Sequence, residues 1–173
     1  MDPAQCIVNH TITAMREAFT PGSSQPPIGG GSDAVRLLAG DTLPLAVWNA
    51  HNDSPGCDEP FLWVRLARRF RTRKFPAVTV EPDPCGLPKA IEVEVGVGRC
   101  AYIDPDGATD WDALAREAEI SLDDSWRIEL ALCRAIALTT GDQCATATAS
   151  ADIVPFGPEG GILAWSGTLY AQL

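Results

Sequence analysis

Residues 90–102, AIEVEVGVGRCAY, are the segment that most constrains the fold. Ile91, Val93, Val95 and Val97 alternate with two glutamates and two glycines, so one side of the segment is apolar and the other is acidic or bare. A period of two is typical of a β-strand with one buried face, which is common in antiparallel sheets. The segment therefore predicts an antiparallel sheet whose apolar face is covered by other elements.

Residues 3–19 have the pattern of a helix that could provide this cover. Asp2 precedes the segment and can accept hydrogen bonds from its first N–H groups, and Pro3 suits the first helical position. An apolar stripe recurs at intervals of four, three and four residues, formed by Val8, Ile12, Met15 and Phe19. We expect this stripe to pack against the sheet.

Residues 121–138 form the strongest predicted helix. Ser121 and Asp124 resemble a capping box at its start. A long apolar stripe, widened by Ile128, Leu132 and Ile136, is formed by Leu122, Trp126, Leu130, Cys133 and Ala137. We expect this stripe to be buried. The preceding residues 111–119 are predicted as a weak helix or an irregular continuation.

The other segments are predicted as strands and loops. Residues 61–66 favour a strand, although Leu62, Leu66 and Phe70 would also share one face of a helix. The closing residues predict a hairpin, with strands at 144–154 and 162–173 and a turn at 155–161, and with Leu163, Trp165, Leu169 and Leu173 on one face. Between the first helix and residue 60 we expect a helical turn at 34–40, a short strand at 43–49 and a turn at 51–60.

Together these elements predict a single α+β domain spanning residues 1–173. It consists of an antiparallel β-sheet with the N-terminal helix and the central helix packed on one face, and it ends in a C-terminal β-hairpin. Residues 20–33 and 76–90, which are rich in proline and glycine, are expected to be extended, flexible loops and candidates for partner contacts.

The positive charge of the chain is concentrated in one short window. The full sequence carries 13 basic and 23 acidic residues, a net charge of −10. Six of the basic residues lie within ten positions: Arg65, Arg68, Arg69, Arg71, Arg73 and Lys74. The other 163 residues carry 7 basic and 23 acidic groups, or −16, which disfavours binding to nucleic acid over most of the surface.

Six cysteines stand at positions 6, 57, 85, 100, 133 and 144, and no pair has CxxC spacing. Met1 is followed by Asp2 and Pro3 rather than by basic residues and an apolar stretch. We therefore expect reduced, mostly buried thiols in a cytoplasmic protein. The sequence also lacks a run of 18 apolar residues, so no membrane span is expected.

Candidate catalytic and metal-binding patterns are weak. Asp104, Asp106 and Asp110 resemble the middle of an EF-hand loop, but the first and twelfth loop positions lack carboxylates, so an Asp-Gly turn is favoured. His10 and His51 are expected to have no cysteine or carboxylate at ligand spacing, although a Cys–His pair formed only in space stays open. Glu92 and Glu94 are interpreted as a solvated strand face. These patterns favour a structural or assembly protein without a cofactor over an enzyme.

Three segments carry a resemblance to a known family: GVGRC (96–100), SLDDSWRIELALC (121–133) and GPEGGILAWSGTLYAQL (157–173). With these segments the chain resembles neck proteins of long-tailed phages of actinobacteria. The order of helix, strands, helix and terminal hairpin is similar to that of tail terminator (tail completion) proteins over roughly residues 1–19 and 60–173. The 20–60 insert and the 76–90 segment depart from smaller family members and leave open another neck role, as an adaptor or a head-completion stopper.

The resemblance implies a homohexameric ring in the virion neck, assembled in the host cytoplasm. Such a ring caps the tail tube, ends its polymerisation and joins it to the head connector, while genomic DNA passes through the lumen without sequence-specific binding. Neighbouring subunits in a ring meet through two different surfaces. We expect the basic residues of 65–74 to contact the acidic surface of a neighbour. The alternatives of other classes are a small enzyme or ligand-binding module and a nucleic-acid-binding protein that uses 65–74.

Overall fold

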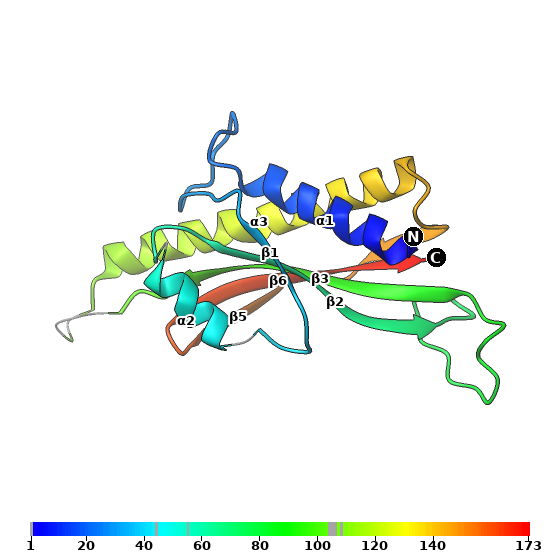
Figure 1. Cartoon of the computed structure of the whole chain (residues 1–173). Helices are drawn as coiled ribbons and strands as arrows, with labels where there is room; N and C mark the ends of the chain where they lie inside the picture. The colour runs from blue at the N-terminus through cyan, green and yellow to red at the C-terminus, as the bar shows by residue number, and fades with distance from the viewer. Residues whose placement is uncertain (1, 44, 55, 104–106, 108) are drawn as a thin grey trace.

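The computed structural model describes residues 2–43, 45–54, 56–103, 107 and 109–173. Within these residues, three helices and one six-stranded sheet form the predicted α+β fold (Figure 1). The elements in chain order are α1 (Pro3–Phe19), β1 (Val35–Leu38), α2 (Leu45–Asp53), β2 (Phe61–Arg71), β3 (Lys89–Cys100), α3 (Trp111–Gly141), β4 (Ala147–Ser150), β5 (Val154–Glu159) and β6 (Ile162–Gln172).

The sheet is mostly antiparallel, as the alternation in β3 predicts. Its strand order is β1-β2-β3-β6-β4, with β5 also paired to β6, and among the described strands only β1 and β2 pair in parallel. The expected C-terminal hairpin is confirmed, but its first strand is β5, most of which lies within the expected turn, while the expected strand at 144–154 contains the separate strand β4, which also pairs with β6. Its turn is only Gly160-Gly161, both with positive φ, instead of the expected 155–161, because two glycines are enough for a tight hairpin.

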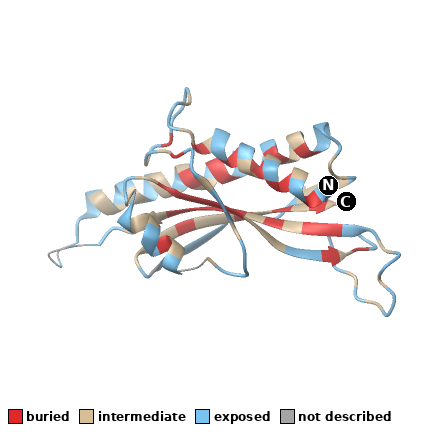
Figure 2. Cartoon of the chain, in the orientation of Figure 1, coloured by how far each residue is buried: buried red, intermediate tan, exposed pale blue. Residues whose placement is uncertain are grey.

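Helices α1 and α3 cover one face of this sheet, and the core lies between the two layers (Figures 1 and 2). Eight sheet residues in this core are 1% exposed or less: Leu62, Val64, Ile91, Val93, Val95, Val97, Leu169 and Ala171. Val8, Met15 and Phe19 of the predicted α1 stripe are buried, and Asp2 Oδ1 accepts from Ala4 N at 3.1 Å as expected for its cap.

The region between α1 and β2 differs from the sequence prediction. Residues 35–38 form strand β1 rather than a helical turn, and residues 45–53 form helix α2 rather than a strand. Neighbouring elements decide both outcomes, since β1 pairs with the long β2 and Trp48 of α2 packs into a second apolar cluster with Phe61 and Trp63. Segments this short follow their tertiary contacts rather than their intrinsic propensity.

Helix α3 is longer than expected and buries a different face. It runs without interruption from Trp111, so Asp110, not Ser121, is its N-cap, and Asp110 accepts from Asp112 N and Ala113 N at 3.0 Å each. The expected buried stripe is wrong: Leu122 is 72% exposed. The buried residues of α3 are instead Asp124, Arg127, Ile128, Ala131, Leu132, Ala135 and Thr139. Alanines allow α1 to approach closely on this side.

The 20–33 loop is fastened to α3 rather than free. Arg127 donates to the carbonyl of Gln25 at 3.0 Å and pairs with Asp123 at 2.8 Å. The same Asp123 carboxylate accepts from the backbone N–H of Ile28 at 3.0 Å. The Arg127 and Asp123 side chains are only 6% and 8% exposed. The buried charges of α3 therefore satisfy backbone groups of the loop, which explains why they face inward.

A second buried pair ties the same loop to the sheet. Arg99, at the end of β3, makes two hydrogen bonds to the Asp124 carboxylate, at 2.6 and 2.8 Å. Its remaining N–H groups donate to the carbonyls of Gly29 at 2.6 Å and Gly30 at 3.0 Å. Burial raises the pKa of Asp124, and the hydrogen bonds from Arg99 oppose that rise. The loop, β3 and α3 thus share one buried polar network.

The cysteines are not the buried free thiols that the sequence predicts. Two disulfides join Cys6 to Cys144 and Cys57 to Cys100, with Cα atoms 6.1 and 5.5 Å apart. Cys85 and Cys133 are unpaired and exposed. Each disulfide connects residues far apart in sequence, by 138 and 43 positions, so sequence spacing could not reveal the pairs.

Candidate interaction surfaces

The six predicted contact residues lie on and just beyond strand β2. Arg65, Arg68, Arg69 and Arg71 belong to β2, while Arg73 and Lys74 follow its end. A register shift between Leu66 and Arg68 opposite β3 changes the alternation within the cluster. The six side chains therefore do not form one row on a single face of the sheet.

Most of these basic groups have acidic partners within the same chain. Arg65 pairs with Glu94 at 2.5 Å and Arg73 with Glu81 at 2.5 Å, and the other two ion pairs are Arg68–Glu92 and Arg69–Asp2. Arg71 donates to the carbonyl of Leu87 at 3.0 Å. Four of the six positive charges are thus balanced locally, so the net field of this strip is much weaker than its composition indicates.

The glutamates of β3 are not a solvated face. Glu94 and Glu92 lie opposite Arg65 and Arg68 in the antiparallel register, and their side chains are only 23% and 19% exposed. The hydrogen bonds that Arg65 donates to Glu94 also raise the pKa of Arg65. Cross-strand pairing of opposite charges explains why the two glutamates of β3 stand opposite arginines of β2.

The glycines of β3 make room for aromatic side chains of the same chain. Trp63 lies opposite Gly96 in the register, and its indole ring occupies the space where a Gly96 side chain would be. The Trp48 ring lies close to Gly98, where an added Cβ would be 3.1 Å from Cζ3. The close approach at these glycines thus comes from tryptophans of the same chain.

A pocket of about 330 Å³ adjoins the Arg65–Glu94 pair. Its walls include Trp48, Trp63 and Phe156. The Trp63 indole N–H donates to Glu94 Oε1 at 3.1 Å, and Arg65 holds both carboxylate oxygens of Glu94. Arg65 and Glu94 are therefore already paired with each other, and beside Asp41 the pocket offers a ligand mainly aromatic and aliphatic surface.

The outer side of α3 carries the clearest candidate interface. Trp111 is 75% exposed, Leu122 72%, Trp126 45% and Leu130 41%. Together with the exposed Ala115, Ala118, Cys133 and Ala137, these residues recur every three or four positions along the helix. We call this set the α3 stripe. A contiguous apolar surface with two exposed tryptophans is typical of a site that another protein covers.

A second, separate apolar surface lies on β5. Val154 and Phe156 are 46% and 64% exposed, and their spacing of two places both on one side of the strand. Within the described residues, β5 pairs with β6 and with no further strand. The chain thus presents two chemically similar but structurally different apolar surfaces.

The candidate metal ligands have different outcomes. Asp104 and Asp106 lie outside the described residues, and Asp110 serves as the cap of α3. The expectation for His10 is wrong, because Cys6 lies one helical turn away and Asp142 Oδ2 is 3.0 Å from His10 Nε2. His51 instead contacts the backbone carbonyl of Glu59 at 2.9 Å.

No family model matches this sequence, and no curated protein matches it at a significant level. Among the described helices, none combines the length and apolarity needed to cross a bilayer. Any function must therefore be argued from the surfaces described above.

Proposed function

We propose that this protein is a structural component of the phage head–tail neck, a tail terminator that assembles into a homohexameric ring. The ring would cap the tail tube, end its polymerisation and join it to the head connector, and DNA would pass through its lumen. The observation that carries the proposal is the exposed α3 stripe, which a second copy of the chain would cover.

The α3 stripe suits a ring because the same chain carries a second, different apolar surface that could contact the stripe of a neighbouring copy. Closed rings form when one patch of a subunit meets another patch of its neighbour. The β5 surface around Val154 and Phe156 is the apolar patch that we assign to the other side of this contact. The basic residues of 65–74 remain a proposed rim of the interface, since Arg68, Arg69 and Arg73 keep at least half of their side-chain surface exposed.

The oligomeric state tests this proposal directly. Six copies of the 18.4 kDa chain weigh about 110 kDa, which light scattering after size exclusion distinguishes from a monomer, and electron microscopy would show a central hole. Leu122→Glu and Trp126→Glu should prevent assembly. Gln5→Glu adds the same charge on the exposed side of α1 and should leave the ring intact.

The result that would overturn the proposal is a chain that stays monomeric alone and also fails to bind the ends of polymerised tail tubes. Assembly that persists in both stripe variants would instead exclude the α3 stripe as the interface. Reversing Arg69 and Arg71 to glutamate tests the rim separately, because unchanged assembly would remove the basic cluster from the contact. Another neck position, as an adaptor or stopper, would show ring formation without binding to tube ends.

A ligand-binding module is the alternative from another class, and the aromatic pocket beside Arg65 favours it. In that case a small aromatic or apolar compound should quench the fluorescence of Trp48 or Trp63 in a saturable manner. A Phe156→Ala change, which removes part of the wall, should weaken such binding.

A further inference from the structure

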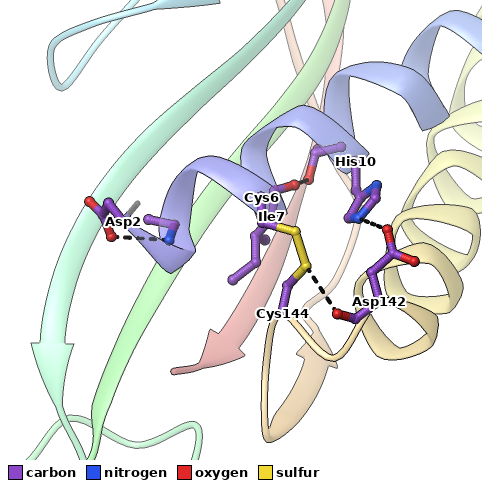
Figure 3. Close-up of a disulfide and its surroundings, with 8 residues drawn as sticks. Asp2, Cys6, Ile7, His10, Asp142 and Cys144 are labelled. Carbon is purple, nitrogen blue, oxygen red and sulfur yellow. Dashed lines mark hydrogen bonds and ion pairs between the residues drawn. A yellow bond between two sulfur atoms is a disulfide. The ribbon is translucent and has the colours of Figure 1, made fainter.

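Four side chains with metal-binding atoms converge where α1 meets the segment between α3 and β4 (Figure 3). Cys6 and His10 are four residues apart on α1, so they share one face of the helix. Cys144 and Asp142 come from the segment that follows α3. The four residues are too far apart in sequence to be recognised together. The Cys-x3-His spacing of Cys6 and His10 on a predicted helix is the part of the set that the sequence shows.

The donor atoms are close enough to share one ion. One ligand atom each from Cys6, His10 and Cys144 lie within 4.8 Å of one another. Ligands of a common tetrahedral zinc ion lie roughly 3.3–3.8 Å apart, given Zn–S near 2.3 Å and Zn–N near 2.0 Å. Small side-chain rotations would bring these atoms to that spacing, and Asp142 Oδ2 already lies 3.0 Å from His10 Nε2.

The Nε2 atom of His10 is free to bind a metal ion. His10 Nε2 is buried, yet among the described residues it has no hydrogen-bond partner of normal geometry. Its approach to Asp142 Oδ2 is short, but it does not meet the direction that a ring N–H requires. A buried imidazole nitrogen without a hydrogen bond is costly unless another partner satisfies it.

In the structure the two sulfurs are joined as the Cys6–Cys144 disulfide. Reduction by a phosphine adds two electrons and two protons to the sulfurs, and water supplies the oxygen of the phosphine oxide. The product is two thiols beside His10 and Asp142. Two thiolates, an imidazole and a carboxylate supply two sulfurs, one nitrogen and one oxygen, which are all donor types that bind Zn²⁺ in proteins.

We propose that the reduced protein binds one Zn²⁺ ion through Cys6, His10 and Cys144, with Asp142 as the fourth ligand. Binding releases the two thiol protons and ties the start of α1 to the segment before β4. The same pair of sulfurs thus links these elements either through zinc, in a reducing compartment, or through a disulfide, in an oxidising one.

The test uses the full chain with the exposed thiols removed, as the Cys85→Ser/Cys133→Ser variant. After phosphine reduction and metal removal, the protein is titrated with Zn²⁺ against a chromophoric chelator and, separately, with Co²⁺. We expect one equivalent of metal, and we expect the cobalt form to show tetrahedral d–d bands and a thiolate charge-transfer band.

Matched variants locate the site. Cys6→Ser and His10→Gln should each weaken zinc binding roughly 100-fold, and Asp142→Asn should weaken it about 10- to 100-fold. The control is the Cys57→Ser/Cys100→Ser pair, which removes the other disulfide and should bind zinc like the parent. Circular dichroism of each reduced variant confirms that it is folded.

The proposal is overturned if the reduced parent takes up less than one equivalent of zinc, or if uptake survives in the folded Cys6→Ser and His10→Gln variants. A cobalt spectrum without thiolate charge transfer has the same consequence. Metal content can be measured for a monomer or a ring alike, so a negative result leaves the proposed assembly unaffected.

Discussion

Replacing Gly96 with alanine tests how tightly Trp63 packs against strand β3. A Cβ at this position would lie 2.5 Å from Cη2 of Trp63, with two further ring atoms nearer still. Normal carbon contacts begin near 3.5 Å, so the nearest ring atom, Cζ2, would have to retreat by about 1.4 Å. Trp63 is 4% exposed and stacks on Phe61 with ring centroids 5.9 Å apart, so there is little room for this movement.

The cost follows from the contacts that the indole would lose. Its N–H donates to Glu94 Oε1 at 3.1 Å, and a hydrogen bond to a charged group contributes about 1.5–3 kcal/mol. Overpacking a filled site costs roughly 1–3 kcal/mol more. Alanine recovers about 0.4–1 kcal/mol by restricting the unfolded chain. We therefore expect Gly96→Ala to lower the free energy of unfolding by about 1.5–5.6 kcal/mol.

Urea denaturation followed by far-UV circular dichroism measures this change. Gly86→Ala is the matched control, because an added Cβ there meets nothing within 4 Å, and its stability should be unchanged or slightly higher. Replacing Trp63 with leucine should remove most of the Gly96→Ala penalty, giving a coupling energy of about 1 kcal/mol or more. A Gly96→Ala protein as stable as the wild type, or a penalty that is the same without the indole, would refute the reasoning.

Two further predictions concern charged groups. Arg127→Met leaves the buried carboxylate of Asp123 without its ion-pair partner, so it should destabilise the protein by about 3–5 kcal/mol and raise amide exchange across residues 20–33. Arg134→Gln removes an exposed ion pair and should leave the denaturation midpoint and the exchange unchanged. Equal exchange in both variants would contradict the anchoring of the loop by Arg127. The hydrogen bond from Arg69 lowers the pKa of Asp2, so this pair stabilises the folded state above the ordinary value of 3.8 and its contribution is lost as the pH falls below it. In an NMR titration the Asp2 carboxyl should have its midpoint below 3.8 and shift upward in Arg69→Gln, whereas an unshifted midpoint in that variant would exclude the pair as the cause.

The sequence by itself determined the elements whose pattern is local and repeated. The alternation of 90–102 predicts β3 and an antiparallel sheet, and the cap and apolar stripe of residues 3–19 predict α1 with its bounds. The closing hairpin was also predictable, although its turn was expected at 155–161 and is formed by Gly160 and Gly161 alone. These signals succeed because a period of two or of 3.6 depends only on neighbours along the chain.

Only the tertiary structure decided which apolar face of α3 is buried. It also decided with which groups the charged side chains of α3 and β2 form ion pairs and hydrogen bonds. Both sides of that helix are apolar, and periodicity cannot choose between them. The choice follows from the inward side chains of Arg127, which donates to a backbone carbonyl of a loop distant in sequence, and of Asp124, which pairs with Arg99 of β3. The basic residues of β2 likewise look like a free patch until the register places Glu94 and Glu92 opposite them. Pairing of charges, cysteines and metal ligands depends on contacts across the fold, which no local pattern records.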